Sequence, residues 1–183
     1  MDYYKETQFL AVVDKHDKMI GRMEKWEAHK KGVLHRGYTA ILEFNNTIIL
    51  QHRKHPAFDN VFDLSFSSHQ LMVNGNLQTD EETIYEGMKR EWNIDKVEIL
   101  SLKFLNKVYY QAKDPISEYS EHEIDYIYLV QLNRQPKANP DYAYGQKTVD
   151  RNNAVSEMQK SGLALAPWVK KIVDLSYFRI RRE

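Results

Sequence analysis

The chain has no cysteine among its 183 residues, which excludes disulfides, thiolate metal sites and catalytic thiols. Neither sign of charge is in excess, because Lys+Arg and Asp+Glu number 26 each. Composition therefore predicts no binding to nucleic acid or to an anionic membrane. No apolar run approaches the length of a membrane span, and the N-terminus lacks the pattern of a signal peptide. We expect a cytoplasmic protein without a membrane anchor.

What is present is ordinary globular composition, with 42% hydrophobic and 28% charged residues. The length favours one domain over residues 1–183. Segments rich in β-branched and aromatic residues predict strands at 8–13, 38–44, 47–51, 96–105, 107–112 and 124–132. Asn45 and Asn46 tolerate the positive φ angles of a tight hairpin, and the polar stretch 133–147 is typical of a loop.

A helix is predicted over 80–92. Thr79 and Glu82 have the spacing of a capping box, and apolar residues then recur at every fourth position. Glu91 borders this apolar stripe, which makes it a candidate ligand for a second metal or for a magnesium-phosphate group; an ordinary solvated glutamate is the alternative. A last helix begins at Pro167. Mixed strands with few helices predict an α+β domain.

Glu121 and Glu123 lie one residue apart at the start of the strand that covers 124–132. Side chains alternate between faces along a strand, so the two carboxylates share a face from which His122 points away. Two carboxylates beside apolar neighbours are costly unless a cation or shared protons compensate. Together with three histidines they would make a five-ligand metal site: His29, His35 and His69. Spacing alone does not select these three from seven histidines, and the glutamates could simply protect a sheet edge.

Three segments carry a recognisable pattern. They are E-K-W-E-A-H-K-K-G-V-L-H-R at 24–36, S-F-S-S-H-Q at 65–70, and V-Y-Y-Q-A-K-D-P with S-E-H-E-I-D-Y-I-Y-L-V between 108 and 130. In these segments the chain resembles the type I isopentenyl diphosphate isomerases, a branch of the Nudix superfamily, and the last segment is the most specific. A closing A-P-W at 166–168 adds to the match, which covers roughly residues 8–176.

The resemblance implies a Nudix fold, an α/β/α sandwich with a central mixed sheet, and a small-molecule diphosphate as substrate. It implies Mn²⁺ or Zn²⁺ at the histidines and glutamates, and Mg²⁺ held with the substrate diphosphate by Glu91. Lys25 and Arg53 would contact the diphosphate. Proton transfer would involve residue 67 and Glu123, with Tyr110 beside it. Trp168 would be the aromatic wall that stabilises the carbocation.

Several positions depart from the family pattern. The family cysteine falls at Ser67, whose hydroxyl is a far weaker acid than a thiol and needs an adjacent base. A pair of family arginines, one of which contacts the diphosphate, falls at Glu86 and Gly87. The expected activity is isomerisation of isopentenyl to dimethylallyl diphosphate. The alternatives are a Nudix hydrolase that cleaves a nucleoside or other diphosphate, for which only Glu91 of the glutamate cluster is in register, and a non-catalytic metal binder. The sequence does not give the oligomeric state.

Overall fold

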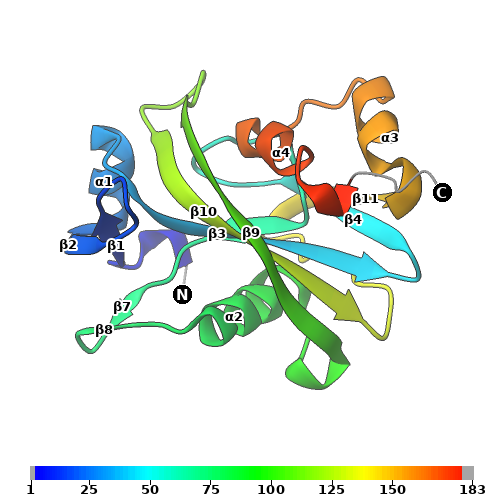
Figure 1. Ribbon diagram of the computed structural model, residues 1–183, viewed down its shortest axis with the longest axis horizontal. Coiled ribbons are helices and arrows are strands. Elements are labelled where there is room, and N and C mark those ends of the chain that lie inside the picture. Colours follow the sequence, from blue (N-terminus) through cyan, green and yellow to red (C-terminus); the bar gives the residue numbers. More distant parts are fainter. Residues whose placement is uncertain (1–2, 179–183) are drawn as a thin grey trace.

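The computed structural model describes residues 3–178, and a nine-stranded mixed sheet runs through its centre (Figure 1). Strand β10 pairs in parallel with β3 and antiparallel with β9, while β3 also pairs antiparallel with β1, β4 and β6. Two short strands form a separate hairpin. The strands are β1 (Phe9–Val13), β2 (Met19–Glu24), β3 (His35–Phe44), β4 (Thr47–Arg53), β5 (Phe62–Asp63), β6 (Phe66–Ser68), β7 (Met72–Val73), β8 (Asn76–Leu77), β9 (Ile99–Lys113), β10 (Ser120–Leu132) and β11 (Ala143–Asp150).

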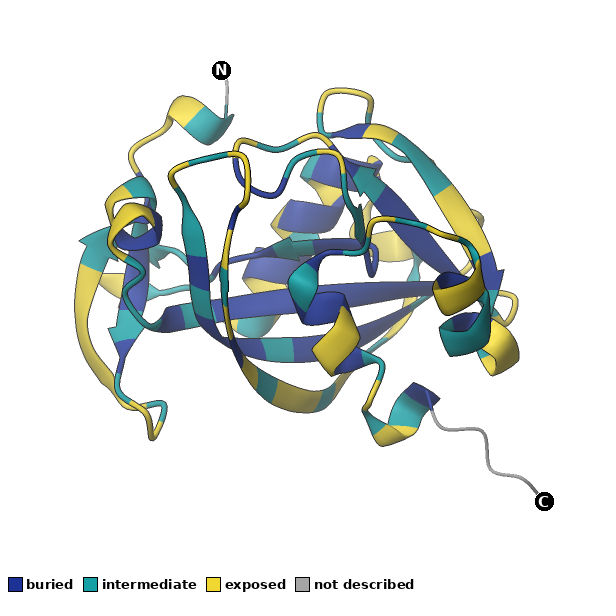
Figure 2. Ribbon diagram, turned by 90° about the horizontal axis from the view of Figure 1, so that it is seen from above, coloured by how far each residue is buried: buried dark blue, intermediate teal, exposed yellow. Residues whose placement is uncertain are grey.

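Helices cover both faces of the sheet. Figure 1 shows α2 on one side and α3 and α4 on the other, and a separate cluster of buried apolar residues lies on each side. The central strands are buried along most of their length, as Figure 2 shows. The α-helices are α1 (Lys25–Lys31), α2 (Asp80–Trp92), α3 (Ala154–Lys160) and α4 (Pro167–Ile172), and the 3₁₀ turns are η1 (Tyr3–Lys5), η2 (Lys96–Glu98), η3 (Arg151–Asn153) and η4 (Ser176–Phe178). Within residues 3–178, none of these helices has the length and apolar content to cross a bilayer.

Two local predictions are confirmed. Helix α2 has the predicted bounds, and Thr79 and Glu82 form the reciprocal capping box. The β3–β4 hairpin turns at Asn45 and Asn46, whose φ angles are 46° and 61°. Both asparagines therefore adopt the left-handed conformation that a type I′ turn requires. The α+β class follows from these elements and is also confirmed.

Other boundaries differ from the prediction. Residues 99–113 form one strand preceded by the turn η2, because β9 pairs with β10 along nearly its whole length. The predicted loop 133–147 ends early, since β11 begins at Ala143 and pairs with β4. Strand β2 and the two seven-residue helices α1 and α3 were not predicted. Helices of two turns are too short to show a clear apolar period.

Candidate metal centre and active site

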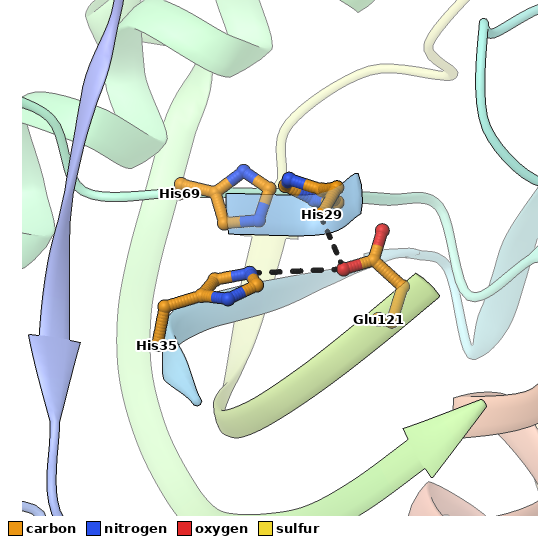
Figure 3. A group of neighbouring side chains, drawn as sticks. All are labelled: His29, His35, His69 and Glu121. Atoms are coloured by element: carbon orange, nitrogen blue, oxygen red, sulfur yellow. Dashed lines mark ion pairs between the residues drawn. The ribbon is translucent and has the colours of Figure 1, made fainter. Parts of the chain in front are cut away.

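Three histidines and a glutamate from separate elements meet in the protein interior (Figure 3). His29 comes from α1, His35 begins β3, His69 follows β6, and Glu121 lies near the start of β10. One potential ligand atom of each lies within 4.8 Å of the others, and all four side chains are buried. The sequence interval between the first and the last exceeds ninety residues, so only the fold brings them together.

The second carboxylate adjoins this group. Glu123 Oε1 lies 2.9 Å from His69 Nε2 and 3.5 Å from His35 Nε2. Sheet pairing fixes this position, because Glu123 is the register partner of His35 on β3. His122, between the two glutamates, points away and contacts the Gly32 carbonyl and the Tyr109 hydroxyl. The predicted division of the two faces is thus observed.

The donor atoms suit a divalent cation. His29 Nδ1 and His35 Nδ1 lie 2.6 and 2.7 Å from the backbone carbonyls of Lys25 and Val33. A carbonyl only accepts, so each Nδ1 carries the proton and each Nε2 is left as a ligand. Glu121 Oε2 lies 3.1 Å from His29 Nε2 and 3.8 Å from His35 Nε2. Within residues 3–178, Glu121 Oε2 and His35 Nε2 are nevertheless buried without a hydrogen bond, as expected of atoms directed at a shared ion.

The pKa values of the cluster residues shift in different directions. Burial lowers the pKa of His29, but the carboxylate of Glu121 outweighs burial, so that the pKa lies above its usual range. Burial, with the charges of His29 and His35, holds the pKa of His69 well below its usual range. Burial raises the pKa of Glu121, and His29 more than compensates. A neutral His69 and an ionised Glu121 are the forms that bind metals, whereas a protonated His29 would have to release its Nε2 proton when the metal binds.

Beside the cluster, Glu123 contacts a tyrosine whose ring lies near that of a tryptophan. The Tyr110 hydroxyl donates a hydrogen bond to Glu123 Oε2. Burial, together with the charge of Glu123, raises the pKa of Tyr110 well above its ordinary value, so the phenol remains a proton donor. The Tyr110 ring lies 5.7 Å from that of Trp168, and Trp168 Nε1 donates to Asp63 Oδ1 at 2.7 Å.

The comparisons with known proteins agree with this arrangement. No family model matches the chain. It is 30% identical over 198 residues to isopentenyl-diphosphate Delta-isomerase 1 of Mesocricetus auratus, a match that covers 95% of this chain and 86% of the relative. The Mus musculus enzyme of the same name is also 30% identical, over 96% of this chain and 86% of its own length. The chain belongs to the isopentenyl-diphosphate Delta-isomerase family.

Solved structures give the fold of this family member. DR0079 from Deinococcus radiodurans superposes with a TM-score of 0.66 at 18% identity and covers 91% of this chain and 97% of its own. The MutT Nudix hydrolase from Burkholderia pseudomallei superposes with a TM-score of 0.56 at 16% identity, over 78% of this chain and 98% of that one. The predicted Nudix fold is confirmed.

One cavity gathers the predicted site residues. All of them line it except His29 and His35, which complete the cluster behind Glu121. The lining residues from the prediction are Lys25, Arg53, Ser67, His69, Glu91, Tyr110, Glu121, Glu123 and Trp168. Their individual roles stay predictions.

Glu91 and Arg53 are both buried and paired with neighbouring side chains. Glu91 is 7% exposed, with Oε1 at 2.8 Å from Arg90 Nη2 and Oε2 at 3.2 Å from Gln51 Nε2. The alternative of an ordinary solvated glutamate is therefore wrong. Arg53 is 4% exposed and paired with Asp63 at 3.0 Å.

Ser67 has the polar neighbours that a serine needs in order to take part in proton transfer. Its Oγ lies 2.8 Å from Thr39 Oγ1, which donates to Asp125 Oδ2 at 2.9 Å. Burial, followed by the charge of Glu123, raises the pKa of Asp125 well above its usual range. A hydrogen-bonded chain thus connects Ser67, at the cavity wall, with a buried carboxyl group.

Sequence reasoning missed residues that only the fold brings to the site. Gly37 on β3 faces Glu123 so closely that any β-carbon at position 37 would collide with the carboxylate. Asp63 holds both Arg53 and Trp168. Arg90 and Tyr3 line the same cavity. The sequence pattern around these four residues does not indicate that they belong to the site.

Proposed function

We propose that the protein is a single Nudix domain over residues 1–183 that interconverts isopentenyl and dimethylallyl diphosphate. The relatives in the comparison carry the name of this reaction. The observation that carries the proposal is the single cavity on which Ser67, the Tyr110–Glu123 pair and Trp168 converge, beside the histidine cluster. Helix α2 contributes one carboxylate to this cavity, Glu91, whereas a Nudix hydrolase uses several glutamates.

The reaction moves a double bond by one position. A proton adds to the terminal CH₂ carbon, which leaves a tertiary carbocation, and a proton then leaves the methylene group on the other side. No atoms are gained or lost overall. We assign one proton transfer to Ser67 and the other to Glu123, with Tyr110 as its hydrogen-bond partner. Trp168 presents an aromatic ring to the cavity, and such a ring attracts a cation by about 0.5–2 kcal/mol.

Ser67 replaces the family cysteine in this proposal. Thr39 and Asp125 provide the hydrogen-bonded route by which a proton reaches or leaves its hydroxyl. A serine therefore need not ionise. It can accept one proton while it passes on another, which removes the main objection to serine at this position.

We assign Mn²⁺ or Zn²⁺ to His29, His35, His69, Glu121 and Glu123, because imidazole and carboxylate donors suit both ions. A cation bound there would supply positive charge beside the Glu123 carboxylate. Mg²⁺ is assigned to the substrate diphosphate and Glu91, since oxygen ligands suit that ion. Lys25 and Arg53 would face the phosphoryl oxygens.

The test is an NMR time course with isopentenyl diphosphate, Mg²⁺ and Mn²⁺, run on wild type, Ser67→Cys and Ser67→Ala. Dimethylallyl diphosphate from wild type but not from Ser67→Ala supports the proposal. Product from Ser67→Cys alone means that the scaffold is intact but that serine does not support the reaction. Phosphate or pyrophosphate release without product overturns the isomerase in favour of a hydrolase.

A further inference from the structure

Three cationic side chains converge on the cavity, and they differ in how many donors are already used. Arg53 directs Nε, Nη1 and Nη2 at Phe58 O, Asp63 and Ala57 O. Lys25 is 2% exposed and lies against the rings of η1. Arg90 Nε is buried without a hydrogen-bond partner in the described part of the chain. Buried donors without partners are rare and destabilising, so Arg90 has capacity for a ligand.

Arg90 donates from Nη2 to two neighbours. Glu91 Oε1 lies at 2.8 Å and Ser68 Oγ at 3.4 Å, the latter a long contact. The side chain is 15% exposed. The cavity lining as a whole carries as many carboxylates (Glu91, Glu121 and Glu123) as cationic side chains (Lys25, Arg53 and Arg90), and Arg53 is paired with Asp63. It is therefore the unused Nε donor of Arg90, and not an excess of positive charge, that favours an anion with several oxygens at this residue.

Position 87, where the isomerase pattern has an arginine, has no room for a side chain in this chain. A β-carbon on Gly87 would lie 2.5 Å from Phe66 Cε2 and 2.6 Å from the Tyr38 hydroxyl. Both are buried in the core on the α2 side of the sheet. No side chain can leave the helix at that point. Residue 90 lies one turn further on, and residues three apart share a helix face.

Tyr3 covers the guanidinium of Arg90. Its ring centroid lies 3.8 Å from Arg90 Cζ and 4.9 Å from Lys25 Nζ. Burial alone would raise the pKa of Tyr3, yet the charges of Lys25 and Arg90 hold it below its ordinary value. The phenol thus occupies a positively charged site.

With η1 in this position the cavity volume is about 10 Å³, about enough for one water. A diphosphate cannot fit in this space unless part of the wall moves, and η1 contributes Tyr3 and Tyr4 to that wall. Tyr4 and His55, whose rings lie 4.8 Å apart, line this cavity and also an outer hollow of about 520 Å³. Movement of η1 would join the two spaces, which gives a diphosphate a route to Arg90.

We infer that Arg90 is a diphosphate-binding residue of this chain, in place of an arginine at position 87, and that Tyr3 covers it until the ligand displaces the tyrosine. The identity of the substrate rests on the proposed function. The unpartnered Nε donor of Arg90 and the closed position 87 do not depend on it.

The test measures binding of inorganic pyrophosphate by isothermal titration calorimetry, with and without Mg²⁺. Charge-assisted hydrogen bonds of a guanidinium are strong enough that Arg90→Gln should weaken binding about 10- to 100-fold in both conditions. Arg90→Lys should recover part of the loss, because an ammonium lacks the planar fork. Arg22→Gln is the matched control. Arg22 lies 5.1 Å from the Phe9 ring, outside the cavity. The Arg22→Gln variant should therefore bind pyrophosphate as tightly as wild type.

Tyr3 is tested separately. Tyr3→Ala should tighten pyrophosphate binding about 2- to 30-fold, because the ligand no longer displaces a cation–π contact. Tyr3→Phe keeps the ring and should stay near wild type. Weaker binding in Tyr3→Ala would overturn the role of Tyr3 as a cover.

Each result for Arg90 decides the inference. Unchanged affinity in Arg90→Gln overturns it, and so does a loss seen only with Mg²⁺, since Arg90 would then act through Glu91. If Arg90→Gln does not fold by circular dichroism, wild-type affinity in Arg90→Lys overturns the need for a guanidinium. The proposed function can be rejected without rejecting this inference, and the inference without rejecting the function. Arg90-dependent pyrophosphate binding without dimethylallyl diphosphate formation rejects the isomerase alone, and product formation with unchanged binding in Arg90→Gln rejects only this inference.

Discussion

Gly87→Ala should lower the free energy of unfolding, although alanine is the better helix former. Gly87 lies within α2, and the substitution gains about 1 kcal/mol of helix propensity. The new methyl group would lie 2.5 Å from Phe66 and 2.6 Å from Tyr38. Both neighbours are buried, at 0% and 2% exposure, so neither can move into solvent.

The magnitude follows from what must move. Overpacking a filled core costs about 1–3 kcal/mol. Moving Tyr38 also endangers its hydrogen bond to the Thr83 carbonyl, 2.9 Å long, which contributes about 1 kcal/mol. The losses exceed the propensity gain, and we expect a net destabilisation of about 1–3 kcal/mol.

Urea denaturation followed by circular dichroism measures this difference. Gly21→Ala is the control, because a β-carbon at Gly21 meets nothing within 4 Å. Tyr38→Phe removes one of the two close atoms, so the double variant Gly87→Ala/Tyr38→Phe should recover part of the loss through favourable coupling. A Gly87→Ala variant as stable as wild type, or more stable, refutes the packing argument and reopens position 87 to an arginine.

Four further outcomes test the site. His29→Ala should abolish the rise in Tm that Mn²⁺ or Zn²⁺ gives to wild type in a thermal melt, whereas His122→Ala, on the opposite strand face, should keep it. Glu123→Gln should abolish dimethylallyl diphosphate formation by NMR while the protein stays folded, and unchanged turnover would exclude this site. Gly37→Ala should lower turnover at least 10-fold, because the new methyl group displaces the Glu123 carboxylate. Burial and the neighbouring cationic charges hold the pKa of His55 well below its usual range. As the pH falls, the imidazole is therefore protonated in the unfolded chain before it is protonated in the folded protein. The free energy of unfolding of the metal-free protein should thus decrease as the pH drops below about 6.5. His55→Gln should flatten that fall in urea midpoints measured from pH 7.5 to 5, and an unaltered slope would contradict the assignment.

The sequence predicted those parts of the fold that local chemistry determines. The capping box placed α2 to the residue, and two asparagines placed the β3–β4 turn. The alternation of side chains put Glu121 and Glu123 on one face of β10. In each case neighbouring residues alone decide the conformation.

The parts that depend on distant contacts were not predictable in this way. Arg90 sits next to Lys89 on α2, and a Lys-Arg pair in the last turn is typical of a solvated helix end. Only the position of Tyr3, 87 residues earlier in the chain, shows that this arginine faces a closed cavity. Gly37 carries no signal either, because its requirement comes from a carboxylate on a different strand.

One sheet register assembles the centre of the site. Glu123 on β10 is paired with His35 on β3 and with Tyr110 on β9. A shift of β10 by a single residue would turn both glutamates to the face that His122 now occupies. It would also put His122 beside the groups that Glu123 now contacts, which are His35, His69 and the Tyr110 hydroxyl. The hydrophobic pattern of β10 that selects the core register therefore also selects the ligand set, so that the stability of the sheet and the geometry of the metal centre depend on the same pairing.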